Sequence, residues 1–407
     1  MNFLLGYIFL LIILFFILLK FKKYPEIKKL ILIAFILRAI LVIISQSDLV
    51  TLPDSNADSL NFELKAQEFS RKEGFSVVYS FFKTDSFLIS KIISIFYTIF
   101  GESEMMAQTI SVGLGTASVY LVYQLCIILW DHRSANKAAW VVAFFPTLIL
   151  YSSLILREVY VVFFLLLGLI GIANFLKKNS FGQFLVALSS FYILTLFHGP
   201  MGLGVLVFIL YTSLMTIKKQ LICLSRLKIN IIYLFVMIIS SIPLILYLTN
   251  NLAVPYIGSI EKMFFLEKII NRINVHIQDS ASYPIWFLIE NNYEFFIKGT
   301  LKIIYFIYSP FLWDLKKNIH IIGFFDAMFY LILTFYIIKN WNAIWSNSVT
   351  RTFLLILVIY LIIYGIGVGN FGTGIRHRSK FFVIFVILAA PKIQKFIFSF
   401  KKKLYKH

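Results

Sequence analysis

Long apolar runs recur along this chain, and they restrict its fold more than any other feature. Each run of roughly 18 or more apolar residues is long enough to cross a hydrocarbon layer about 30 Å thick. With 60% hydrophobic residues and a mean hydropathy of +0.87 over 407 residues, an ordinary soluble domain is excluded. The sequence therefore predicts an all-α polytopic membrane protein, with residues 1–407 forming a single integral-membrane domain.

We expect eleven membrane crossings, or up to thirteen if two weaker apolar stretches also cross. These two stretches, 86–100 and 299–312, are placed at the membrane interface, since the first is short and contains Lys91 and the second is only weakly apolar. The eleven expected spans are 3–19, 30–44, 106–129, 138–155, 158–176, 181–197, 199–217, 229–249, 320–338, 352–369 and 381–398.

The basic residues indicate which ends of these spans face the cytoplasm. Loops on the side of Lys20–Lys29 hold 21 basic and two acidic residues, whereas the opposite loops hold 15 of each. Cytoplasmic loops carry an excess of lysine and arginine, so the +19 charge of the chain is assigned to that side, together with the C-terminus. Topology accounts for the charge, and no nucleic-acid partner is expected. We place the protein in the plasma (inner) membrane, with the lipid bilayer as its surroundings.

Three polar regions then share the outer, periplasmic face. The first outer loop, 47–105, contains nine acidic and five basic residues, a net charge of −4. The second outer region is 250–319, and a short outer basic loop covers 370–380. An acidic loop of this size between membrane helices is more than a connector, and we expect it to be a catalytic loop that includes interfacial helices.

Asp54 and Asp58 are the candidate catalytic carboxylates of this loop. They lie four residues apart in the run PDSNADSLNF. An ionised carboxylate just outside the membrane can act as a general base and take a proton from an incoming hydroxyl group. The same residues in a run of Pro, Asp, Ser and Asn also suit a turn or a helix cap, and spacing alone favours neither interpretation.

The outer basic loop offers candidate phosphate ligands. Arg376, Arg378 and Lys380 lie where the distribution of basic residues disfavours them, with His377 between the two arginines. The planar guanidinium group of arginine suits phosphate, and pairing with lipid headgroups is the alternative. The preceding glycines spell GxGxxG, but no strand precedes them, so a dinucleotide site is discounted.

Four further charged or polar residues lie at expected helix ends or inside a span. Arg157 and Glu158 form the only charged pair between two apolar stretches, and they would serve either as an internal salt bridge or as a substrate contact. His198 lies at another outer helix end. Arg38 lies inside the second expected span and needs a partner, for which Asp326 is a candidate.

Cofactor motifs are sparse. The two cysteines, Cys126 and Cys223, have no metal-ligand spacing, and the sequence lacks both a zinc-protease motif and a P-loop. No metal ligand is assigned. The acidic loop could hold a divalent metal, although nothing in the sequence requires one.

Taken in order, these segments resemble the C-type integral-membrane glycosyltransferases, which include protein O-mannosyltransferases and bacterial lipid-A aminosugar transferases. The matching features are Arg38 in LRAILVI, an outer loop with Asp58, Phe62 and Ala66, the pair Phe100-Gly101, the run FFPTLILYSSLILREVYVVFFLLLGL (144–169), and RHR before the last span. An additional first helix and the lack of a large soluble C-terminal domain distinguish this chain from the family pattern.

The resemblance implies a fold of the same type and an activity. It assigns the base role to Asp58 and the binding of the donor phosphate to Arg157, Arg376 and Arg378. The donor would be a polyprenyl-phosphate sugar, and the acceptor a hydroxyl group of a glycan, lipid or protein. The LRE run also resembles membrane O-antigen polymerases. A flippase or transporter of lipid-linked glycans is the alternative from a different class, and it would require charged groups along a path at mid-membrane depth.

Overall fold

The computed structural model describes residues 2–47, 51–81, 86–224 and 281–393, and within these ranges the chain is helical apart from turns and one isolated bridge. Five of the described helices are long and apolar enough to cross a membrane, which agrees with a helical membrane protein. These five segments are Phe3–Lys20, Glu104–Leu129, Arg157–Lys178, His320–Lys339 and Ser348–Gly367. The count of eleven spans stays a prediction, and the expected span 229–249 lies outside the described residues.

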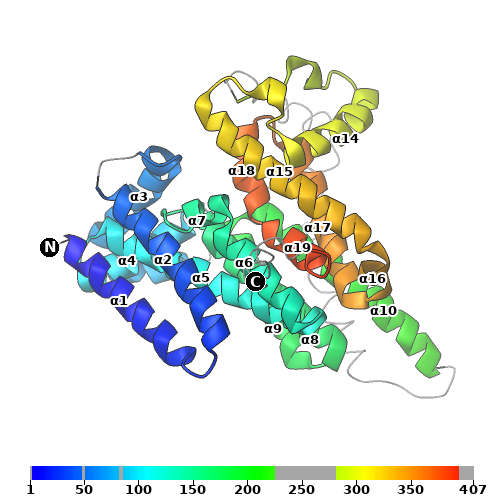
Figure 1. Cartoon of the computed structure of the whole chain (residues 1–407), viewed down its shortest axis with the longest axis horizontal. Helices are drawn as coiled ribbons and strands as arrows, with labels where there is room; N and C mark the ends of the chain where they lie inside the picture. The colour runs from blue at the N-terminus through cyan, green and yellow to red at the C-terminus, as the bar shows by residue number, and fades with distance from the viewer. Residues whose placement is uncertain (1, 48–50, 82–85, 225–280, 394–407) are drawn as a thin grey trace, which may run out of the picture.

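Helices α1 (Asn2–Lys20), α2 (Pro25–Ser45) and α5 (Glu104–Leu129) pack together on the N-terminal side of the molecule (Figure 1). Between α2 and α5, the first polar loop folds into α3 (Leu60–Lys72) and α4 (Leu88–Phe100), which pack against each other. At 13 residues each, both helices are too short to cross a membrane of about 30 Å. They are therefore compatible with the interfacial helices expected in this loop.

The expected span 138–155 is not one helix, and this prediction is wrong in detail. Helix α6 (His132–Phe144) stops before Pro146, and α7 (Pro146–Tyr151) is only six residues long. Proline has no N–H group to donate within a helix and favours a helix start, so the break falls where the sequence places it. Residues 152–156 are buried and non-helical, and they lead directly into α8 (Arg157–Lys178).

Several helices from the later part of the chain form a second group. It contains α14 (Asn292–Tyr308), α15 (Asn318–Lys339), α16 (Trp341–Ser346) and α17 (Ser348–Gly367), with α10 (Leu203–Leu224) against α17. Gly365 permits the close approach of α14 to α17, since a side chain there would lie 2.8 Å from the Cα atom of Ile303. Helix α9 (Phe181–Phe197) belongs to the first group and packs on α8.

Two short helices lie between these groups, α18 (Phe371–Ser379) and α19 (Phe382–Ala389) (Figure 1). Every residue from 381 to 390 is at most 3% exposed, so α19 is a core element. The expected span 381–398 is thus too long for the helix observed, which ends before Pro391, and residues beyond 393 lie outside the described part. Side chains from other helices donate to carbonyl groups at its end, including Asn340 Nδ2 to Leu388 at 3.0 Å.

Candidate functional site

Hydrogen bonds of the backbone hold the loop that carries Asp54 and Asp58. Asp54 adopts a left-handed conformation with φ +65°, which aspartate tolerates better than most residues, and its carbonyl oxygen accepts a hydrogen bond from Ser59 N at 3.3 Å. The buried Ser59 hydroxyl accepts a hydrogen bond from Ile155 N at 3.1 Å. The segment before α8 therefore holds this loop in place, and the carboxylate of Asp58 reaches Arg376.

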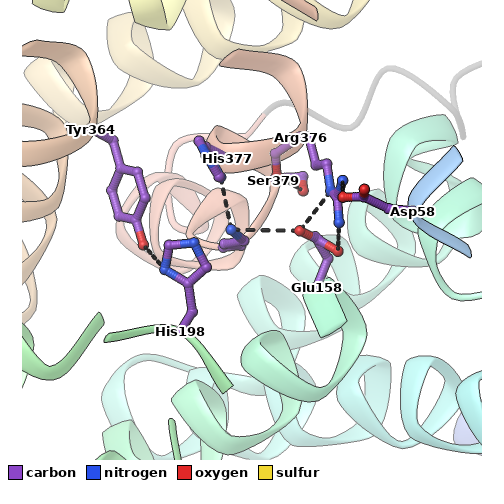
Figure 2. Close-up of polar contacts among 8 residues, drawn as sticks. Asp58, Glu158, His198, Tyr364, Arg376, His377 and Ser379 are labelled. Atoms are coloured by element: carbon purple, nitrogen blue, oxygen red, sulfur yellow. Dashed lines mark hydrogen bonds and ion pairs between the residues drawn. The ribbon is translucent and has the colours of Figure 1, made fainter. Parts of the chain in front are cut away.

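Arg376 joins three elements that are far apart in the sequence. Its Nε and Nη2 atoms donate to the two carboxylate oxygens of Glu158 at 2.8 and 3.3 Å, and its Nη1 atom donates to Asp58 (Figure 2). The side chain of Glu158 is 2% exposed and that of Arg376 12%, whereas that of Asp58 is 46% exposed. The cluster thus opens to its surroundings at the Asp58 end and is closed at the Glu158 end.

Lys380 and His377 extend the cluster away from Asp58. Lys380 Nζ lies 3.5 Å from Glu158 Oε1 and 2.8 Å from Nδ1 of His377. Burial lowers the pKa of Lys380 to about 7, although Glu158 opposes this change. Burial, followed by the charge of Lys380, also lowers the pKa of His377 well below its usual value. Neutral His377 can therefore accept a hydrogen bond from Lys380.

His198 and Tyr364 complete the described network. The Tyr364 hydroxyl lies 2.8 Å from His198 Nδ1 (Figure 2), and the His198 and His377 rings are 5.3 Å apart. Burial, with a contribution from Lys380, lowers the pKa of His198 well below its usual value, which favours the neutral ring. Sequence reasoning missed Tyr364, and its only signal is its place one turn before the end of α17.

Arg157 lies in the same cluster with a less occupied guanidinium group. It is the first residue of α8, its guanidinium carbon lies 5.7 Å from the ring centre of Phe62, and its charge acts on both Lys380 and His377. Within the described residues, Arg157 forms no ion pair within 4.0 Å, and its Nε atom has no hydrogen-bond partner. Of the three site cations, Arg157 is the one without an ion-pair partner among the described residues.

Arg378 faces away from this cluster. Its guanidinium group binds Asp326 through Nε at 3.0 Å and Nη2 at 2.6 Å, and its Nη1 atom donates to the carbonyl oxygens of Phe306, Ile307 and Ser309. The side chain is 1% exposed. The structure therefore separates Arg378 from Arg376, and it leaves Arg378 no open side for a phosphate ligand.

Arg38 borders the site but forms no hydrogen bond with the Arg376 cluster among the described residues. The suggested partner Asp326 is wrong, because Asp326 pairs with Arg378, and Arg38 Nη1 instead donates to Ala34 O at 2.8 Å and Ala143 O at 3.5 Å. Arg38 and Glu158 line a small cavity together with Tyr151. Within the described chain, Nε of Arg38 has no hydrogen-bond partner.

Asp54 lies at the edge of the Arg376 cluster. Its carboxyl group interacts electrostatically with Arg376, Glu158 and Asp58, and Tyr151 lies near it. Burial raises the pKa of Asp54, and the attraction of Arg376 opposes that change. Tyr151 is a second site residue that sequence reasoning missed, since an apolar run gives no reason to single out one tyrosine.

The site has the composition of an anion-binding and proton-accepting centre. Three carboxylates (Asp54, Asp58 and Glu158) lie near three cationic side chains (Arg157, Arg376 and Lys380). Among the residues that the structure describes, no group of three or more His, Cys, Asp or Glu side chains could hold a metal ion.

Comparison with known proteins adds no assignment, since no protein-family model and no curated protein matches this chain. The resemblance to C-type glycosyltransferases therefore stays a prediction that rests on the motifs quoted above.

Proposed function

We propose that this protein is a membrane glycosyltransferase, which moves a sugar from a polyprenyl-phosphate carrier to a hydroxyl acceptor on the outer face of the membrane. One observation carries the proposal: a half-exposed carboxylate, Asp58, lies against the largely buried Arg376, which shares Glu158 with the buried Lys380. Such a transfer needs a base for the acceptor and positive charge for the departing phosphate.

Asp58 is the best candidate for the base. Its side chain is 46% exposed, so an acceptor hydroxyl can reach it, whereas Glu158 is 2% exposed and already bound to Arg376 and Lys380. Asp54 is partly buried and forms no ion pair with a site cation among the described residues. Position and access therefore favour Asp58, in agreement with the base role that the family resemblance implies.

The reaction then proceeds as follows. Asp58 takes the proton of the acceptor hydroxyl, and the acceptor oxygen forms a bond to the anomeric carbon of the sugar. The bond between that carbon and the phosphate oxygen breaks, and its electron pair stays on the phosphate. Arg157 and Arg376 stabilise the negative charge that develops there, and Lys380 adds to the local positive potential.

A transfer assay tests the proposal directly. Purified protein in detergent is incubated with radiolabelled polyprenyl-phosphate sugars and candidate glycan, lipid and protein acceptors. We expect labelled acceptor and free polyprenyl phosphate, with Glu73→Gln, an exposed carboxylate in the same loop, as an active control. Extension of glycans from lipid-diphosphate carriers without use of the monophosphate donors would instead indicate a polymerase. Movement of lipid-linked glycan across proteoliposomes without a new glycosidic bond would indicate a flippase.

The orientation is a separate prediction, which rests on the loop charges. Thr373 and Ser346 are exposed and lie beyond opposite ends of α17. In a chain with both native cysteines replaced by serine, Thr373→Cys should react with an impermeant thiol reagent in intact cells, and Ser346→Cys should react only after lysis. The opposite labelling pattern would place the Arg376 cluster on the cytoplasmic side.

A further inference from the structure

We propose that the Asp58 carboxylate and the phosphate of the donor compete for the same atom, Nη1 of Arg376. The phosphate displaces Asp58 from Arg376 and thereby releases it to act as the base. This inference rests on the proposed function, and it adds an order to it: the donor binds before the acceptor can be deprotonated.

The three hydrogen bonds of Arg376 differ in a way that permits this exchange. Glu158 is buried and holds Nε and Nη2, so it fixes the plane and the direction of the guanidinium group. Asp58 holds only Nη1 and comes from the half-exposed end of the cluster. Loss of Asp58 therefore leaves Arg376 in position, with one free N–H pointing toward the open end.

Nη1 is also a suitable place for a phosphate oxygen. Arginine binds carboxylate and phosphate oxygens with the same geometry, so the Asp58 carboxylate occupies a position that a phosphate oxygen can take. Arg157 adds a second guanidinium group, which forms no ion pair within 4.0 Å among the described residues and whose charge acts on the same cluster. A phosphate near both arginines would be attracted by two positive charges, whereas Asp58 forms a single ion pair with a half-exposed side chain, which is a weak type of contact.

The displacement has a consequence for catalysis. While Asp58 is hydrogen-bonded to Arg376, one of its carboxylate oxygens is engaged and its negative charge is compensated. An acceptor hydroxyl cannot use that oxygen while Arg376 holds it. Binding of the phosphate frees the oxygen, so the base becomes available only when the sugar to be transferred is present.

Binding measurements without any transfer step test the competition. The probe is farnesyl monophosphate, a short polyprenyl phosphate that carries no sugar, with farnesol as the uncharged control. Asp58→Asn should bind the phosphate probe roughly two- to five-fold more tightly than the wild type, since the competing charge is removed. Asp54→Asn is the matched control, because Asp54 lies in the same loop and accepts no hydrogen bond from Arg376. It should change the affinity less than Asp58→Asn does.

A double-mutant cycle makes the assignment to Arg376 specific. Lysine cannot bind both oxygens of Glu158 and still offer a third, fixed N–H group, so Asp58→Asn should bring little gain in an Arg376→Lys background. An unchanged or weaker affinity in Asp58→Asn overturns the competition, as does an equal gain in Asp54→Asn. If the wild type does not bind the phosphate probe better than farnesol, the phosphate donor itself is wrong. Tight wild-type binding with no gain in Asp58→Asn would leave the proposed function intact and remove only the exchange.

Discussion

The two sides of α18 use the same residue type for opposite purposes. Arg376 faces a cluster that includes a half-exposed carboxylate, a lysine and a histidine, whereas Arg378 is enclosed by Asp326 and three carbonyl groups. Residues two positions apart on a helix are rotated by about 200° from each other, so the two arginines of the RHR motif lie on opposite sides of α18. The Arg376 side keeps one half-exposed ion-pair partner, and the Arg378 side is fully enclosed.

The carbonyl groups around Arg378 come from the end of α14 and from the turn that follows it. Asp326 belongs to α15, and its second oxygen accepts a hydrogen bond from Thr147 of α7. Arg378 thereby joins the two groups of helices at a point that solvent does not reach. Buried partners balance the charge of Arg378. The charge of Arg376 is balanced partly by Asp58, a half-exposed loop residue.

Arg378→Met should therefore produce the largest loss of stability. Removal of one partner of a buried ion pair leaves Asp326 uncompensated and should reduce the free energy of unfolding by about 3–5 kcal/mol. The thermal midpoint in detergent measures the effect. The double variant R378M/D326L should recover a large part of it, because no unpaired charge remains.

Arg376→Met is the matched control for this comparison. Glu158 would keep Lys380 as a partner and Asp58 would keep its exposure, so the loss should be less than half of that for Arg378→Met. Equal losses in the free energy of unfolding would show that the two arginines stabilise the fold equally, which would contradict the difference between the two sides of α18.

Asp58→Asn should produce the next largest effect, on transfer and not on stability. The substitution keeps the shape of the side chain and removes the proton acceptor, so the transfer rate should fall by a factor on the order of 10², equivalent to about 2.7 kcal/mol. The thermal midpoint should stay near that of the wild type, because the Asp58 side chain is 46% exposed. Rate measurements at saturating donor and acceptor separate this loss from changes in binding.

Asp54→Asn provides the comparison within the loop. If Asp54→Asn abolishes transfer while Asp58→Asn remains active, the base is the residue next to Tyr151, and the Arg376 cluster serves binding alone. Full activity in both variants would exclude both aspartates as the general base.

The sequence predicted most of the residues of the Arg376 cluster but not how they pair. Hydropathy identified a helical membrane protein, and the position of Arg376 and Lys380 against the charge bias identified the basic loop. Asp58, Glu158 and Arg376 come from three segments separated by about a hundred residues or more, and only the packing of α18 on α7 and α8 brings them together. The sequence pattern alone does not show that these three residues contact each other.

The different surroundings of Arg376 and Arg378 could not be predicted from the sequence either. Both were expected to bind phosphate, because an outer RHR motif shows two equivalent cations. Their difference depends on a nine-residue helix in a region where glycine-rich sequence does not favour helix formation. The sequence also suggested Asp326 as the partner of Arg38. The ion pair between Asp326 and Arg378 excludes that pairing.

The smallest expected effect is a dependence on pH that belongs to the Arg376 side. In the folded protein, burial lowers the pKa of Lys380 from 10.5 to about 7, so Lys380 loses its charge as the pH rises through 7. Between about 7 and 10.5 the unfolded chain binds more protons at this residue than the folded chain does, and this lysine therefore makes folding more favourable as pH rises through that range. Donor binding should respond in the opposite sense, because the charged form attracts phosphate.

Affinity for farnesyl monophosphate at pH 6 and pH 8.5 measures this response. The ratio of the dissociation constants of the wild type and Lys380→Met cancels the titration of the probe itself. At pH 6 the wild type should bind more tightly by a factor of about five, since one nearby charge contributes on the order of 1 kcal/mol, and at pH 8.5 the two proteins should bind alike. Equal affinity at both pH values would mean that Lys380 does not act on the phosphate. A five-fold difference that persists at pH 8.5 would mean that Glu158 keeps Lys380 charged throughout, and the Asp58 contact would then be the adjustable one on the Arg376 side.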